Sequence, residues 1–219
     1  LVRSRGLGDV YKRQILNNTI IIIASDNGYA LDEKTHWKKR GLWETDIRIP
    51  FIIADMRNPT NINSSIPISL LDIFPTLCDF ANIEPPLNGE GNSYLDGISS
   101  KKIYSDTSLI YERPVLTIFK DALGLEASCF EQYSVRNDRF HYIEYHSNNL
   151  PPALDCDPSK TIMEKELYEI GIDKKTDPNE WNNLAADSSF QPVKNYLQQW
   201  LPDSSMYLQI PYSVEIKNN

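Results

Sequence analysis

The chain is poor in cysteine, with Cys78, Cys129 and Cys156 the only three among 219 residues. An odd number without CxxC spacing makes neither a disulfide framework nor a zinc cage. Long apolar runs are also missing, since the longest, residues 20–24, is far shorter than the roughly 20 residues needed to cross a bilayer. The sequence therefore predicts no membrane span.

An excess of positive charge is absent as well. Lys and Arg number 22 against 30 Asp and Glu, which gives a formal net charge of −8. This balance argues against nucleic-acid binding and against a basic membrane-surface patch. Hydrophobic residues make up 41% of the chain, which is enough for a core and too much for a disordered protein. We expect an ordinary α/β or α+β protein.

Residues 1–14 show neither a helical nor a strand period and resemble translated sequencing-adaptor sequence. We treat them as a non-native leader and exclude them from fold reasoning. The protein's own sequence is then expected to start near Ile15, as the later part of a longer protein.

Residues 15–100 are predicted to be part of an α/β domain. The β-branched run Thr19–Ala24 is apolar on both faces, which is typical of a central parallel strand between helix layers. Ile47–Ala54 predicts a second strand, with Pro50 near its start. Tyr29–Asp46 is polar and reads as an excursion over the sheet edge. A helix is expected from Asp72 to about Asn82, with one apolar face made by Leu70, Phe74, Leu77 and Ala81.

Residues 101–219 are predicted to form a small α+β subdomain after a turn-rich linker at 84–92. The dipeptide Asn137-Asp138 suits a tight hairpin, and Phe190–Trp200 is an amphipathic helix stopped by Pro202. The four expected strands are 115–119, 132–136, 140–145 and 166–170.

The first chemical motif is Ser25-Asp26-Asn27-Gly28, directly after the Thr19–Ala24 strand. Open α/β sheets place ligand sites at the carboxyl ends of their strands. Asp26 and Asn27 offer hard oxygen donors, which suit a calcium-type ion better than zinc. Taken alone, the four residues could equally be a plain strand-to-loop turn.

A cationic cluster follows, made of His36, Lys38, Lys39 and Arg40. Such a cluster can hold a tetrahedral anion and stabilise charge that develops in a transition state. Taken alone, it could also be a solvated loop that pairs with the acidic residues Asp32, Glu33, Glu44 and Asp46.

Joined at this spacing, Ser25–Glu44 and Ile47–Phe51 resemble the second conserved block of the type I sulfatases, above all the iduronate-2-sulfatase-like subset. The resemblance spans about residues 18–202. Its further segments are 70–77, 95–97, 133–143, 166–168 and 177–185.

This resemblance implies the C-terminal part of an alkaline-phosphatase-like α/β sandwich, followed by a small antiparallel sheet with a helix. It implies a sulfuric ester hydrolase that acts on sulfated sugars or other sulfated small molecules. Asp26 and Asn27 match the metal pair that helps to hold Ca²⁺. Lys39 matches the lysine that contacts the sulfate, and His36 matches a histidine of the active site. Members of the family are usually exported.

The family's formylglycine arises in a Cys/Ser-x-Pro-x-Arg motif, which this sequence lacks. The nearest match, Cys156–Lys160, has Lys in place of Arg. We expect the formylglycine and the first metal-binding aspartates upstream, so this chain alone should be inactive. Two other functions stay open: a zinc-dependent phosphomonoester or phosphodiester hydrolase, against which Asn27 argues, and a non-catalytic glycan-binding relative.

Overall fold

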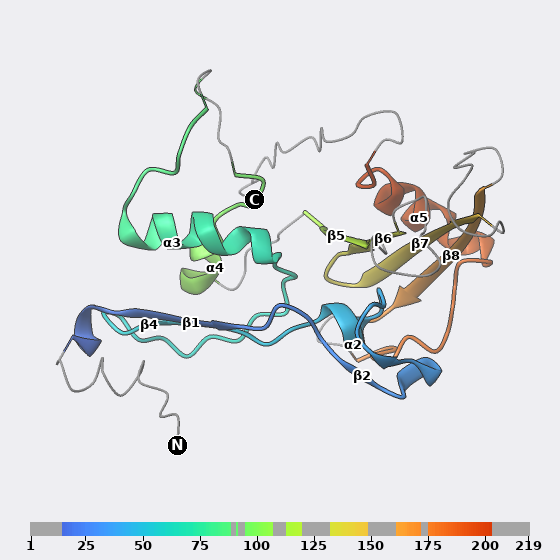
Figure 1. Cartoon of the computed structure of the whole chain (residues 1–219), viewed down its shortest axis with the longest axis horizontal. Helices are drawn as coiled ribbons and strands as arrows, with labels where there is room; N and C mark the ends of the chain where they lie inside the picture. The colour runs from blue at the N-terminus through green and yellow to red at the C-terminus, as the bar shows by residue number, and fades with distance from the viewer. Residues whose placement is uncertain are drawn as a thin grey trace.

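The computed structural model describes residues 15–88, 91, 95–106, 113–119, 132–148, 161–171 and 175–202. The predicted leader 1–14, Cys129 and Cys156 lie outside these ranges. A long two-stranded ribbon with two helices above it occupies one side of Figure 1, and a four-stranded sheet occupies the other.

The ribbon is formed by β1 (Ile20–Ala24) and β4 (Phe51–Asp55), which pair antiparallel with Ile22 opposite Ile53. A short 3₁₀ turn, η1 (Leu16–Asn18), leads into β1. The expectation of a parallel strand buried on both faces is wrong, since Ile23 is 48% exposed. β4 is the one described strand that pairs with β1.

Pro50 immediately precedes β4, as expected, because a proline there removes no donor from the ladder. The strand begins at Phe51 rather than at Ile47, because residues Glu44–Ile47 form the helical turn α2. Between the two strands the chain makes a small antiparallel pair, β2 (Ala30–Leu31) with β3 (Trp37–Lys38), joined by the turn η2 (Glu33–Thr35).

The predicted helix is present as η3 (Leu70–Asp72) followed by α3 (Ile73–Ala81). Its predicted apolar face is not the buried one, because Phe74 is 52% and Leu77 39% exposed. The opposite face packs toward α4 (Lys101–Ser105), where Phe80 contacts Tyr104 edge-to-face at 5.4 Å between ring centres. Thr76 Oγ1 accepts the backbone N–H of Ser100 at 2.8 Å. This buried hydrogen bond fixes which face of α3 turns inward.

The second sheet contains the four predicted strands. Its order is β5-β6-β7-β8 with every pair antiparallel, and its strands are β5 (Val115–Phe119), β6 (Gln132–Arg136), β7 (Phe140–Asn148) and β8 (Thr161–Glu169). However, β7 extends beyond the predicted 140–145 and β8 starts before the predicted 166–170. The predicted hairpin closes through Asn137 N–H to the Phe140 carbonyl at 3.0 Å.

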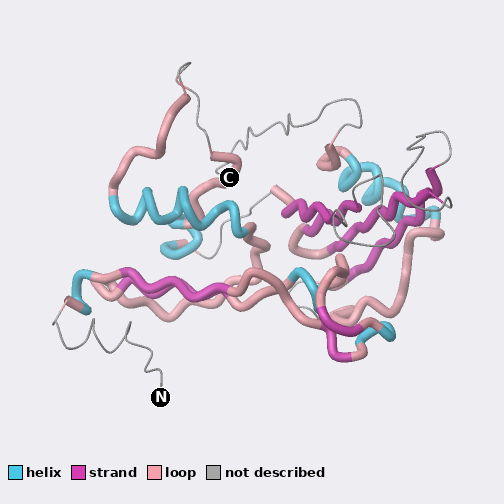
Figure 2. Tube along the Cα trace, viewed as in Figure 1, coloured by secondary structure: helices cyan, strands magenta, loops and turns pink. Residues whose placement is uncertain are grey.

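The C-terminal helix covers one face of this sheet (Figure 2). After the turn η6 (Ser188–Phe190), α5 (Gln191–Gln198) places the fully buried Leu197 in the core. The buried residues around it are Val135, Phe140, Tyr142 and Leu167. None of the helices within the described ranges is long and apolar enough to cross a membrane.

Candidate active site

The predicted metal pair lies in the turn after β1. Asp26 is exposed and Asn27 half-buried, and Ser25 Oγ donates to the Asn27 carbonyl at 2.8 Å. Gly28 N–H donates to the carbonyl of Asp46 at 2.7 Å. A Cβ at Gly28 would overlap the Thr45 carbonyl. The Asp-Asn-Gly turn is therefore held against α2 through a glycine that no larger residue could replace without movement.

Asp46 also contacts the segment that carries the predicted cations. Its side chain is 1% exposed, and Oδ1 lies 3.5 Å from His36 Nε2. A Cβ at Gly41 would overlap the same carboxylate. His36 packs edge-to-face on Trp43 at 5.9 Å between ring centres. One residue of α2 thus anchors both the Asp26 turn and the loop around Lys39.

Burial raises the pKa of Asp46. The neighbouring His36 acts against this shift, and the nearby Glu33 adds to it. A raised carboxyl pKa in the folded state means that the unfolded chain loses this proton first as the pH rises. The contribution of Asp46 to stability must then fall as the pH rises from about 3.9, the ordinary Asp value.

Substituting Asp46→Asn removes this titration while nearly preserving side-chain shape. We expect the unfolding free energy of the wild-type chain, minus that of Asp46→Asn, to fall from pH 4 to pH 7. Urea unfolding of both proteins at a series of pH values measures this difference. A difference that grows with pH would contradict the raised pKa.

Lys39 lies between Lys38 and Arg40, and all three are exposed. In the described part of the chain, no hydrogen bond or ion pair joins the Lys39 amine to Asp26 or to Asn27. The two predicted groups are therefore related through their shared anchor Asp46, not through direct contact.

The backbone of this loop is strained. Five non-glycine residues between positions 32 and 40 have positive φ angles: Asp32, Lys34, Thr35, Lys38 and Arg40. Such conformations cost about 1–3 kcal/mol each, the more so for a β-branched residue such as Thr35, and persist only where surrounding structure enforces them. Hydrogen bonds within the loop, such as those from the Asp32 N–H to the His36 carbonyl and from the His36 N–H to the Glu33 carbonyl, support this shape together with the contact of Lys34 to the sheet.

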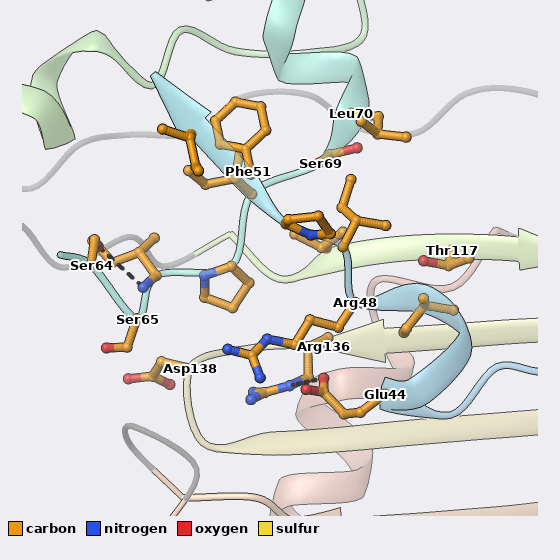
Figure 3. Close-up of a pocket in the computed structure, with 18 of the residues that line it drawn as sticks. Glu44, Arg48, Phe51, Ser64, Ser65, Ser69, Leu70, Thr117, Arg136 and Asp138 are labelled. Atoms are coloured by element: carbon orange, nitrogen blue, oxygen red, sulfur yellow. Dashed lines mark hydrogen bonds and ion pairs between the residues drawn. The ribbon is translucent and has the colours of Figure 1, made fainter. Parts of the chain in front are cut away.

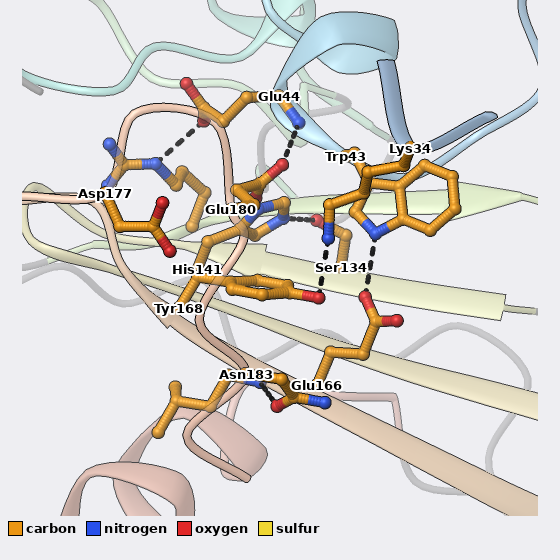
Figure 4. Close-up of polar contacts among 12 residues, drawn as sticks. Lys34, Trp43, Glu44, Ser134, His141, Glu166, Tyr168, Asp177, Glu180 and Asn183 are labelled. Carbon is orange, nitrogen blue, oxygen red and sulfur yellow. Dashed lines mark hydrogen bonds and ion pairs between the residues drawn. The ribbon is translucent and has the colours of Figure 1, made fainter. Parts of the chain in front are cut away.

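A buried polar cluster that the sequence did not identify as a site holds the helical turn α2, which follows this loop (Figure 4). Glu44 N–H donates to Glu180 Oε2 at 2.8 Å, and Arg136 Nε donates to Glu44 Oε1 at 2.9 Å. The other oxygen of Glu180 pairs with His141 Nδ1, and His141 Nε2 meets Ser134 Oγ. A signal was present in the sequence: Ser134, Arg136 and His141 place polar side chains in the middle of a predicted sheet.

The order Ser134–His141–Glu180 has the composition of a nucleophilic triad, but its burial excludes that function. Ser134 and His141 are 0% exposed, and Glu180 is 2% exposed. A serine nucleophile must reach a substrate, whereas this hydroxyl lies inside the protein. The cluster therefore acts on structure.

A separate cavity of about 600 Å³ lies between β4, residues 63–70 and the four-stranded sheet (Figure 3). Its charged lining includes Glu44, Arg48, Arg136 and Asp138. None of the four sequence-predicted site residues lines it. The cavity thus adjoins the buried cluster and not the exposed turn that carries Asp26.

The donor atoms of the exposed turn can be compared with the ligands that a metal ion prefers. Asp26 and Asn27 supply oxygen donors only, which fits Ca²⁺. Within the described residues, no group of three or more His, Cys, Asp and Glu side chains could hold a metal. In oxygen chemistry alone, Asp26 and Asn27 are compatible with two ligands of a calcium ion.

Comparison with protein families finds that residues 7–83 match the family Sulfatase. A sulfatase of Formosa agariphila is 28% identical over 207 residues, which are 91% of this chain and 34% of that protein. Arylsulfatase K of Rattus norvegicus is 26% identical over 209 residues, 95% of this chain and 33% of that protein. N-acetylglucosamine-6-O-sulfatase of Bacteroides thetaiotaomicron is 28% identical and is covered to 30%. The chain thus spans about a third of the length of these curated relatives.

Two solved structures share the fold. One was determined with its substrate D-glucosamine-2-N,6-O-disulfate; it is 26% identical, with a TM-score of 0.57 over 89% of this chain and 35% of that one. The other is the yidJ protein of Bacteroides fragilis, a candidate sulfatase, 18% identical with a TM-score of 0.61 over 89% and 37%. The predicted α/β fold of the alkaline-phosphatase-like type is confirmed.

Proposed function

From the match of residues 7–83 to the family Sulfatase, we propose that the whole protein hydrolyses sulfate esters and that this segment binds the metal and the sulfate. The supporting observation is the double anchoring on Asp46, whose carbonyl binds Gly28 at 2.7 Å while its carboxylate lies 3.5 Å from His36. This arrangement keeps a carboxylate-amide pair and a cationic loop on one small element.

In this proposal Lys39 binds an anionic oxygen of the sulfate and stabilises the charge that builds there during reaction. A lysine suits this task, because its ammonium is a compact charge on a long stem. His36 turns Nε2 toward Asp46, which leaves Nδ1 to exchange a proton with the substrate. Both residues stand as proposed catalytic groups.

Asp26 and Asn27 would contribute oxygen ligands to Ca²⁺, which neutralises sulfate oxygens when it is bound. The nucleophile expected for the family, a hydrated formylglycine, would come from the upstream part of the whole protein. Cys78 is half-buried and is followed by Asp-Phe-Ala-Asn, so it does not fit the motif.

The proposed substrate class is a sulfated sugar. Support comes from one solved relative that was determined with a disulfated glucosamine as its substrate. We also propose that the whole protein is exported, as the family resemblance suggests.

The deciding experiment measures release of sulfate and of phosphate from model esters by the whole protein, supplied with Ca²⁺ or with Zn²⁺. Calcium-dependent sulfate release supports the proposal. Zinc-dependent phosphate release alone would favour the phosphoester hydrolase. Binding of sulfated glycans without turnover would favour a non-catalytic relative.

Asp26→Ala should weaken calcium binding by the whole protein, because a carboxylate ligand is lost. Isothermal titration with Ca²⁺ measures the change. Asp32→Ala is the matched control, since Asp32 lies in the same loop region and is also exposed. An unchanged calcium affinity in Asp26→Ala would reject the ligand assignment.

A further inference from the structure

The four-stranded sheet makes several polar contacts with residues 32–44, the segment that contains the cationic loop (residues 32–40) and the start of α2 (Figure 4). Besides the bonds to Glu44, Trp43 Nε1 donates to Glu166 Oε2 at 2.8 Å. Lys34 Nζ donates to Tyr168 OH at 2.7 Å, and its ammonium lies 4.2 Å from the centre of that ring. These partners are more than 120 positions apart in the sequence, so the sheet holds the loop from outside.

The contact at Glu180 is the most deeply buried of them. Glu180 is 2% and Glu44 7% exposed. A hydrogen bond to an ionised group in such surroundings is stronger than a neutral one, and losing one partner leaves the other buried without compensation. Glu180 accepts the Glu44 N–H at 2.8 Å, at the first residue of α2.

His141 fixes the carboxylate of Glu180 in turn. Its Nδ1 meets Glu180 Oε1, while Nε2 is held by Ser134 on the adjacent strand. The second oxygen of Glu180 is therefore aimed at the start of α2. From there α2 leads within two residues to Asp46, the anchor of both His36 and the Asp26 turn.

We propose that Glu180 is a positioning residue of the anion site: it fixes the start of α2, and through Asp46 sets the placement of the strained loop that carries His36 and Lys39. This inference rests on the proposed function for the chemistry of that loop. The placement itself rests on the contacts alone, because left-handed residues are costly and persist only where neighbouring structure enforces them.

Fluorine NMR of this chain labelled with 5-fluorotryptophan tests the placement. The chain has four tryptophans. Trp37 lies in the loop and Trp43 directly precedes α2, whereas Trp200 packs on the core of the sheet and reports retention of the fold. Trp181 is the neighbour of Glu180 and is left out of the comparison. In Glu180→Ala we expect the Trp37 and Trp43 resonances to shift or broaden while Trp200 keeps its position. Glu169→Ala is the control, because Glu169 pairs with the exposed Arg139; it should leave the resonances of Trp37, Trp43 and Trp200 in place.

Unmoved Trp37 and Trp43 resonances in a folded Glu180→Ala chain would overturn the proposal. If Trp200 shows that Glu180→Ala has unfolded, Glu180→Gln decides instead. Its amide keeps the size and one acceptor oxygen, so smaller shifts of Trp37 and Trp43 are expected, and their absence would again overturn the proposal.

A second arm measures sulfate-ester hydrolysis by the whole protein with 4-nitrophenyl sulfate. Glu180→Ala should lower kcat by at least about tenfold with a smaller effect on KM, the scale typical of residues that orient active-site groups, and Glu180→Gln should recover part of it. Full kcat in Glu180→Ala would refute positioning. If the wild-type protein hydrolyses no sulfate ester, the proposed function fails, while the fluorine spectra still decide whether Glu180 holds the loop.

Discussion

Replacing Lys39 with alanine in the whole protein lowers kcat/KM for a sulfate ester by at least about a hundredfold. This is the scale of losing one donor that stabilises developing transition-state charge. Lys39 is exposed and directly follows β3, so its removal should leave the fold intact. Steady-state kinetics with 4-nitrophenyl sulfate, together with thermal unfolding of both proteins, measure the two effects.

Lys38→Ala is the matched control for this experiment. Lys38 is the neighbouring exposed lysine, but it belongs to β3 and pairs with Ala30. Its loss should change kcat/KM by much less than the loss of Lys39. Near wild-type turnover in Lys39→Ala, or equal losses in the two variants, would remove Lys39 from the site.

Asp72→Ala is expected to destabilise this chain by about 3–5 kcal/mol, the usual effect of breaking a buried ion pair from one side. Asp72 is 1% exposed and binds Arg113 through both oxygens, at 2.8 and 3.0 Å. It also accepts the backbone N–H groups of Ser69 and Ile98. Its removal takes this carboxylate from the buried Arg113 and frees the start of α3 from the segment around Ile98.

Urea unfolding followed by circular dichroism measures this change. The control is Asp79→Ala on the same helix, since its pair with Lys101 has side chains that are 44% and 41% exposed. An exposed pair contributes at most about 1 kcal/mol. Equal destabilisation by the two substitutions would show that Asp72 and Arg113 are not a buried stabilising pair.

Local patterns predicted the small sheet well. Polar and apolar residues alternate along the strands on either side of Asn137, and a short turn joins these strands. The residues that pair are therefore close together in the sequence. The β1 run shows the limit of this reasoning. A β-branched apolar run tells that a strand prefers burial, but it does not identify its neighbour, and β1 pairs antiparallel with β4.

The prediction of which face of α3 is buried was wrong for a related reason. Periodicity marks which side chains favour burial, whereas the described fold turns Thr76 and Phe80 inward through contacts with Ser100 and Tyr104. Neither partner could be anticipated from the helix sequence alone.

For the candidate site, too, the sequence identified some residues and missed others. Asp26, Asn27, His36 and Lys39 could be named from motif spacing and family resemblance, and their roles stay predictions. Glu180 could not be named, because its bond to Glu44 joins residues 136 positions apart. Buried pairing of this kind leaves no local period in a sequence.

The left-handed residues between Asp32 and Arg40 also limit how a synthetic peptide could mimic this loop. A synthetic peptide covering residues 29–46 would lack α2's attachment to the sheet and would relax to right-handed and extended conformations. Antibodies raised against such a peptide should recognise the denatured chain and miss the native one. A faithful mimic of this surface would need D-amino acids or glycine at the left-handed positions, or a scaffold that replaces the sheet.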